Sequence, residues 1–172
     1  EMCIRDSCCL RVRDYECAVK AYRSFLAHRP RSLAKRDYRA RAGLALALLG
    51  NKDARGALRE ARLSLGQKQG YARASVAKAR AQYALGQCDS ALLGYKALKS
   101  KLGARYRLHA MDIGRVELCL RHYRSALEQA EIALSVRRND QDALLLKSDA
   151  LMGLRRYHAA VAILLAVHNR DK

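Results

Sequence analysis

The chain has few residues that interrupt helices. Its 172 residues include one proline, Pro30, and no tryptophan, and β-branched residues are few, whereas there are 30 alanines and 27 leucines. Proline breaks helices and β-branched residues weaken them, while alanine and leucine are among the strongest helix formers. The composition therefore predicts an all-α protein.

Long apolar runs are also lacking. No stretch approaches the roughly 18 to 20 consecutive apolar residues that a helix needs to cross a bilayer. We therefore expect no membrane span.

The six cysteines lack the spacing of a metal site. There is no Cys-x-x-Cys and no cysteine pair matched by a histidine pair, so no zinc site is predicted. Cys88 and Cys119 fall where helical hairpins should pack, and we expect them to be buried, reduced thiols.

Signs of catalysis are similarly scarce. The five histidines are scattered, with no His-x-x-x-His pair, and no serine or cysteine has a base partner at helical spacing. The ten glycines form no phosphate-binding loop. We predict no enzyme, no catalytic or metal-binding residues and no cofactor.

Acidic residues are outnumbered about two to one. The chain has 34 basic and 16 acidic residues, a net charge of +18, and most of the basic residues are arginine. Arginine recognises phosphate and carboxylate well. However, no long uninterrupted basic block occurs, so these charges are equally typical of solvated outer helix faces.

What the chain does contain is an alanine that returns on a near-fixed period. The spacings are 39, 34, 35 and 34 residues, in the series Ala18, Ala57, Ala91, Ala126 and Ala160. A period of 34 residues in a helix-rich chain predicts stacked helical hairpins.

The hairpins can be placed from breaker residues and periodicity. Residues 1–7 do not continue the pattern and are expected to be a non-native scar, which leaves 8–172 as a single repeat domain. The expected repeats are 8–32, 33–69, 70–103, 104–139 and 140–172. The expected helices are 14–28, 33–49, 53–65, 71–85, 89–102, 104–120, 123–136, 141–154 and 157–167.

Small and aromatic residues recur at set places in these hairpins. A small residue precedes each inter-helix turn by seven residues, in the set Gly43, Ala79, Gly114 and Ser148. Tyr15, Tyr123 and Tyr157 each begin a second helix, and Pro30 ends a repeat. On these residues the chain resembles a tetratricopeptide-repeat protein, although the tryptophan of that family is absent. The resemblance implies an α-solenoid, a right-handed superhelix of about four and a half repeats.

The resemblance also implies a concave groove lined by the first helix of each pair. Projected onto that surface, the partner-binding residues are Arg41, Arg73, Val76, Arg80, Tyr83, Met111, Arg115 and Asp149. We hypothesise a scaffold that grips a partly acidic protein segment or peptide there. The alternative is a basic repeat protein that binds RNA or another polyanion through its backbone, without a base-reading code.

The last helix is apolar all round. Every residue from Ala159 to Val167 is hydrophobic, so we expect this helix to be covered, either by further repeats or by self-association. The default compartment is the cytoplasm. The periplasm is the alternative, because the native N-terminus is expected to be missing.

Overall fold

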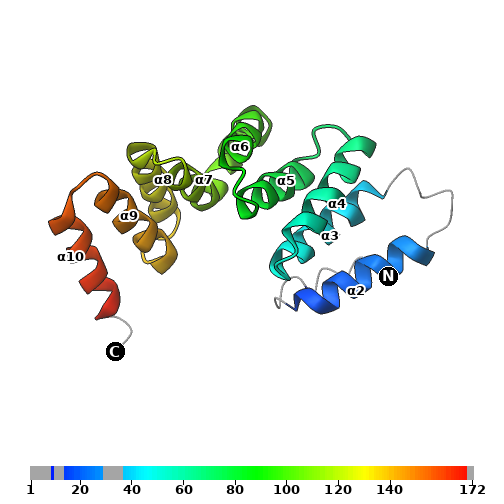
Figure 1. Ribbon diagram of the computed structural model, residues 1–172, viewed down its shortest axis with the longest axis horizontal. Coiled ribbons are helices and arrows are strands. Elements are labelled where there is room, and N and C mark those ends of the chain that lie inside the picture. The colour runs from blue at the N-terminus through cyan, green and yellow to red at the C-terminus, as the bar shows by residue number, and fades with distance from the viewer. Residues whose placement is uncertain (1–8, 10–13, 29–36, 170–172) are drawn as a thin grey trace. The chain divides into compact units, whose positions relative to one another are not determined.

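The computed structural model describes residue 9, residues 14–28 and residues 37–169. Residues 1–7 and Pro30 lie outside these ranges. Every described element is helical, as Figure 1 shows. The elements are α2 (Tyr15–His28), α3 (Tyr38–Gly50), α4 (Ala54–Gln67), α5 (Ala72–Ala84), α6 (Cys88–Leu102), the 3₁₀ helix η2 (Gly103–His109), α7 (Ala110–Cys119), α8 (Tyr123–Val136), α9 (Gln141–Gly153) and α10 (Tyr157–His168). The predicted all-α fold is confirmed.

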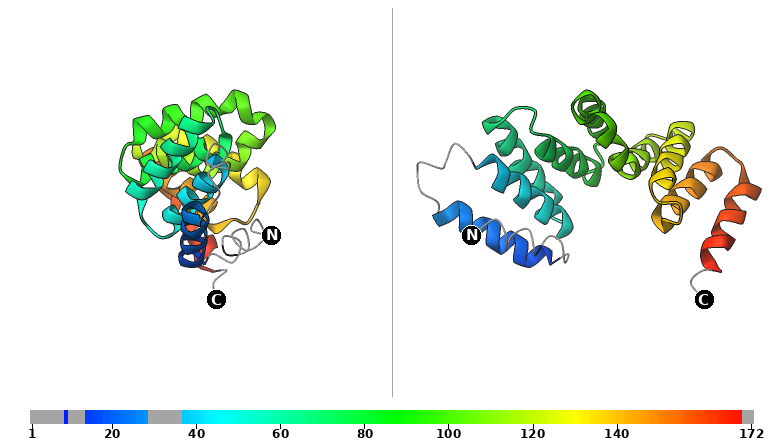
Figure 2. Two further views of the ribbon diagram at one scale, coloured as in Figure 1. Left: turned by 90° about the vertical axis from the view of Figure 1, so that its right-hand side faces the viewer. Right: turned by 180° about the vertical axis from the view of Figure 1, so that it is seen from behind.

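The chain divides into two compact units, Glu1–Leu98 and Lys99–Lys172, and each is described by itself. In the first unit α2 packs on α3, α3 on α4 and α4 on α5, and α3 also reaches α5. The second unit repeats this order, with α7 on α8, α8 on α9, α9 on α10, and α7 against α9 (Figure 2). From α2 to α5 and from α7 to α10, each helix thus contacts the next one in sequence, as in a stack of hairpins.

The four hairpin turns that the structure describes share one geometry. In each, a residue with left-handed backbone is followed by an amide that donates back to a carbonyl five residues earlier, at 2.8 to 2.9 Å. The left-handed residues are Lys52, Gly86, Arg121 and Arg155. They are 34, 35 and 34 residues apart, so the backbone conformation repeats with the same period as the sequence.

The second hairpin is regular, contrary to the register inferred from its sequence. Its left-handed residue is Lys52, so Ala45, and not Gly43, is equivalent to Ala79 and its counterparts. Gly43 instead lies under the Tyr22 ring of α2, where a Cβ atom would overlap that ring. The additional residues of the 39-residue step therefore belong to the connection between α2 and α3.

The recurring alanines lie where helices approach closely. Ala18, Ala57, Ala91 and Ala126 are completely buried, and Ala160 is 1% exposed. In the last hairpin the Ser148 hydroxyl of α9 donates to the carbonyl of Ala160 in α10 at 3.3 Å. Small side chains allow such close approach, so the recurring alanines mark contacts between helices.

One predicted helix is split. The sequence suggested a continuous helix over 104–120, but residues 103–109 form η2 and α7 begins only at Ala110. Gly103 has a φ of 50°, a left-handed conformation that ends α6 and redirects the chain into the tighter 3₁₀ turns.

The cysteines differ from the expectation of reduced thiols. Cys9 and Cys17 form a disulfide, with their Cα atoms 5.9 Å apart. Neither Cys88 nor Cys119 is a free thiol. Cys88 is buried as expected, whereas Cys119 is exposed.

Candidate binding surfaces

The first candidate surface lies on α5. Arg73, Val76, Arg80 and Tyr83 follow one another at intervals of three and four residues, so they share one face of the helix. Arg73 is exposed, Arg80 is half-buried and Tyr83 is 36% exposed, while Val76 lies in the core at 7%. Among the described residues no carboxylate pairs with Arg73. We call Arg73, Arg80 and Tyr83 the α5 face.

Arg41 is engaged within the fold. Its Nη1 donates to Oε2 of Glu60 on α4 at 2.8 Å, and the two side chains are only 20% and 11% exposed. Arg41 therefore joins α3 to α4 and presents little of its charge to solvent.

The remaining predicted groove residues belong to the second unit. Met111 and Arg115 lie one turn apart on α7, and Asp149 lies on α9. Arg115 is within 3.4 Å of Asp142 on α9, so its charge is compensated inside this unit. An anionic partner consequently finds more unpaired positive charge on α5 than on α7.

A basic and aromatic cluster at the N-terminal ends of α3 and α5 was not predicted. The rings of Tyr38 and Tyr71 pack edge to face with centroids 5.0 Å apart, and Lys68 Nζ lies 4.9 Å from the Tyr38 centroid. Arg39 Nε donates to the Tyr38 hydroxyl at 3.2 Å, which lowers the pKa of Tyr38. Tyr71 is the N-cap of α5, two residues before Arg73, so the cluster adds cationic and aromatic groups beside the α5 face.

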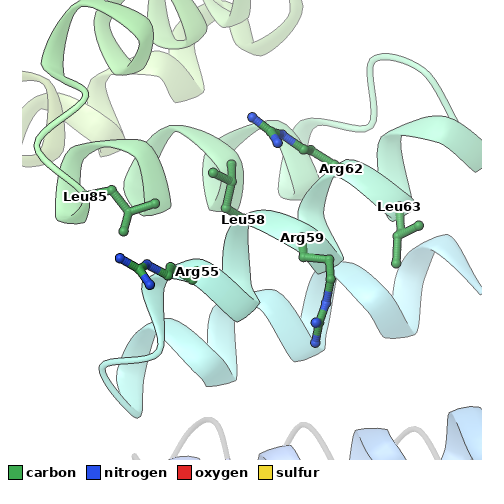
Figure 3. Close-up of a pocket in the computed structure, with 6 residues that line it drawn as sticks. All are labelled: Arg55, Leu58, Arg59, Arg62, Leu63 and Leu85. Atoms are coloured by element: carbon green, nitrogen blue, oxygen red, sulfur yellow. The ribbon is translucent and has the colours of Figure 1, made fainter.

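A cavity beside α4 is lined by arginine and leucine (Figure 3). It has a volume of about 340 Å³ and lies between α4 and the C-terminal end of α5. Its lining residues are Arg55, Leu58, Arg59, Arg62, Leu63 and Leu85. We call it the arginine pocket.

The last helix exposes an apolar face. Tyr157, Val161, Leu164 and Leu165 are 36% to 59% exposed. The equivalent tyrosines, Tyr15 and Tyr123, have their rings packed over a glycine of the next helix, Gly50 and Gly153 respectively. Tyr157 is thus exposed at a position where Tyr15 and Tyr123 pack against a following helix. We call Tyr157, Val161, Leu164 and Leu165 the α10 face.

Within the described ranges, no group of three or more potential metal ligands comes together. In the same residues no helix is long and apolar enough to cross a membrane.

Comparisons with solved structures show a tetratricopeptide-like fold. The chain is similar to MamA 41-end from Desulfovibrio magneticus RS-1, with a TM-score of 0.75 at 15% identity over 96% of this chain and 90% of that one. It is also similar to a tetratricopeptide repeat protein from Parabacteroides merdae ATCC 43184, with a TM-score of 0.70 at 15% identity over 99% and 65% of the two chains. The apo form of RapI matches with a TM-score of 0.58 at 16% identity, over 94% and 50%. No protein-family model and no curated protein matches the sequence.

Proposed function

We propose that this tetratricopeptide-like repeat protein is an interaction scaffold that binds an acidic segment of another protein on the α5 face. The observation that carries the proposal is the uncompensated charge of Arg73, set on one helix face with Arg80 and Tyr83. Guanidinium groups form strong, charge-assisted hydrogen bonds with carboxylates, and tyrosine supplies apolar area with a polar tip.

The surrounding charges support the binding of an acidic segment at this place. Lys68, beside Tyr71, adds a cation at the start of α5. In the second unit Arg115 already has a carboxylate partner, and in the first Arg41 has another. The free energy of binding an acidic segment is therefore expected to come mainly from Arg73, Arg80 and their neighbours at the N-terminal end of α5.

The alternative function is binding of RNA through its phosphates. The net charge of +18 favours it, but a backbone-only complex loses affinity steeply with salt because each phosphate contact releases counterions. A peptide that contacts two or three arginines and a tyrosine makes fewer ionic contacts than RNA does, so its affinity falls less as the salt concentration rises.

Fluorescence anisotropy with two labelled probes separates these functions. One probe is a short extended peptide of alternating glutamate and leucine, and the other is oligo-uridine, each titrated at about 50 mM and about 200 mM salt. We expect the peptide to bind at both salt concentrations and the RNA to lose most of its affinity at the higher one. Stronger RNA than peptide binding at about 200 mM would favour the alternative.

Charge-reversal variants locate the site. Arg73→Glu combined with Arg80→Glu should weaken peptide binding about tenfold or more, because two attractive contacts become repulsive. The matched control reverses Arg105 and Arg124, two exposed arginines of the second unit, and should bind the peptide as the unaltered chain does. Equal losses in both double variants would show that only net charge matters.

We also propose that the α10 face mediates self-association. Tyr15 and Tyr123 show that a helix covers this position elsewhere in the chain, whereas Tyr157 is 59% exposed. Sedimentation at increasing concentration should show association that Leu165→Glu abolishes. Leu93→Glu, on α6, is the control because Leu93 is also exposed. A chain that stays monomeric at all concentrations would contradict this proposal.

A further inference from the structure

The three arginines of the arginine pocket form one array. Arg55, Arg59 and Arg62 are four and three residues apart on α4, so their Cα atoms lie along one side of the helix, and all three residues are exposed. Figure 3 shows the Arg55 guanidinium next to Leu85, with Arg59 and Arg62 extending in opposite directions from α4. Arg55 and Arg62 are separated by seven residues, which is about 10 Å along the helix axis.

The nearby carboxylates are already engaged. Asp53 caps α4 by accepting from the amide of Gly56 at 2.8 Å. Glu60 accepts from Arg41 at 2.8 Å, and its second oxygen lies only 3.8 Å from Arg59. Among the described residues, no carboxylate pairs with Arg55 or Arg62. The charges of Arg55 and Arg62 are therefore open to an anionic ligand.

The base of the pocket is apolar. Leu58 is nearly buried, at 7% exposed, while Leu63 is 45% exposed and Leu85 is half-buried at the end of α5. A ligand that covers Leu63 removes apolar surface from water, which a simple inorganic anion cannot do. The cavity of about 340 Å³ has room for one or two apolar side chains.

From this geometry we propose that the arginine pocket is a second binding site for an acidic, amphipathic protein segment. The segment carries two carboxylates about 10 Å apart, which pair with Arg55 and Arg62, and an apolar side chain between them that packs on Leu58 and Leu63. On a helical partner, glutamates seven residues apart with leucine midway satisfy this spacing. The site lies on α4 and does not depend on the α5 face.

A peptide fits this pocket better than RNA does. Proteins that hold single-stranded RNA stack its bases on aromatic side chains, and the pocket is lined by leucine and arginine only. Phosphates alone would pair with the arginines and leave the leucines exposed to water. The apolar base therefore distinguishes the two classes of ligand.

The test uses the full chain and three labelled helical peptides. The first has glutamate at positions seven apart with leucine between, the second has glutamine in place of each glutamate, and the third has serine in place of each leucine. Fluorescence anisotropy should show binding of the first peptide, with at least several-fold weaker binding of the other two. Equal binding of the leucine and serine peptides would overturn the proposal, because it would mean that the apolar base contributes nothing.

Variants of the chain then assign the site. The double variant Arg55→Glu, Arg62→Glu should weaken the first peptide about tenfold or more, and Leu63→Ser should weaken it several-fold. The control double variant Arg105→Glu, Arg124→Glu has the same change in net charge and should bind normally. Both sets of arginines are exposed, and circular dichroism checks that the helices are retained.

Two further outcomes are decisive. The α5-face variant Arg73→Glu, Arg80→Glu should leave this peptide's affinity unchanged, which keeps failure of this site distinguishable from failure of the proposed function. If the arginine-pocket variant loses affinity for oligo-uridine and not for the peptide, the pocket is an RNA contact and the proposal is wrong.

Discussion

Replacing Gly43 by alanine should destabilise the protein, although alanine is the better helix former. The new Cβ atom would overlap two ring carbons and the hydroxyl oxygen of Tyr22. That ring is 6% exposed and belongs to the same core cluster as Val19, Leu44 and Leu48, so it has little room to move. The substitution therefore sets steric strain against helix propensity.

The magnitude follows from these two opposing terms. Overpacking a core typically costs about 1–3 kcal/mol, and a rigid ring points to the upper part of that range. Alanine regains about 1 kcal/mol of helix propensity relative to glycine. The free energy of unfolding should thus fall by about 1–2 kcal/mol, which lowers Tm by roughly 2–8 °C. Urea denaturation followed by circular dichroism measures the change.

Gly66→Ala provides the matched control. Gly66 lies in α4 with no atom within 4 Å of an added Cβ, so this variant should be more stable by about 0.5–1 kcal/mol. The penalty of Gly43→Ala should also shrink when Tyr22 is replaced by leucine, which removes the ring edge. If Gly43→Ala stabilised the protein as Gly66→Ala does, or if its penalty were unchanged without the ring, the packing assigned to α2 and α3 would be refuted.

Three further predictions concern single side chains. Asp53→Ala should lower the free energy of unfolding by about 1 kcal/mol in urea denaturation, because the amide of Gly56 loses its capping carboxylate; an unchanged midpoint would contradict that role. Leu98→Ala should cost about 2–5 kcal/mol by the same assay, since Leu98 is 2% exposed, and a loss below 1 kcal/mol would mean that its site is not packed. The pKa of Tyr38 is held below its usual value by the Arg39 hydrogen bond, so Arg39→Ala should raise that pKa, as followed by ultraviolet absorbance during a pH titration; no upward shift would exclude the contact.

Most of the helical architecture could be predicted from the sequence because local signals coincide with it. The helix Tyr123–Val136 begins and ends where periodicity placed it. The turns at Lys52, Arg121 and Arg155 carry less signal, because their left-handed backbone occurs at residues other than glycine and is held by the hydrogen bond that closes each hairpin. For that reason the residue seven positions before the second turn is Ala45, two residues after the predicted Gly43.

The candidate sites depend on contacts between helices that a single sequence does not contain. Arg41 pairs with Glu60, 19 residues away, and Arg115 with Asp142, and neither pairing follows from helical spacing. The sequence did not predict the arginine pocket, because the family resemblance implies a groove lined by the first helix of each hairpin, whereas α4 is a second helix. The recurrence of Arg55, Arg59 and Arg62 at intervals of four and three residues was the available signal.

The central claim is that the α5 face is the surface that holds an acidic partner. The most direct measurement is amide chemical-shift mapping by NMR of the full chain titrated with the glutamate–leucine peptide at about 200 mM salt. We expect saturable shifts centred on Arg73, Arg80 and Tyr83 that disappear in the Arg73→Glu, Arg80→Glu variant. Shifts spread over exposed basic residues of both units, with no greater effect on α5, would contradict it.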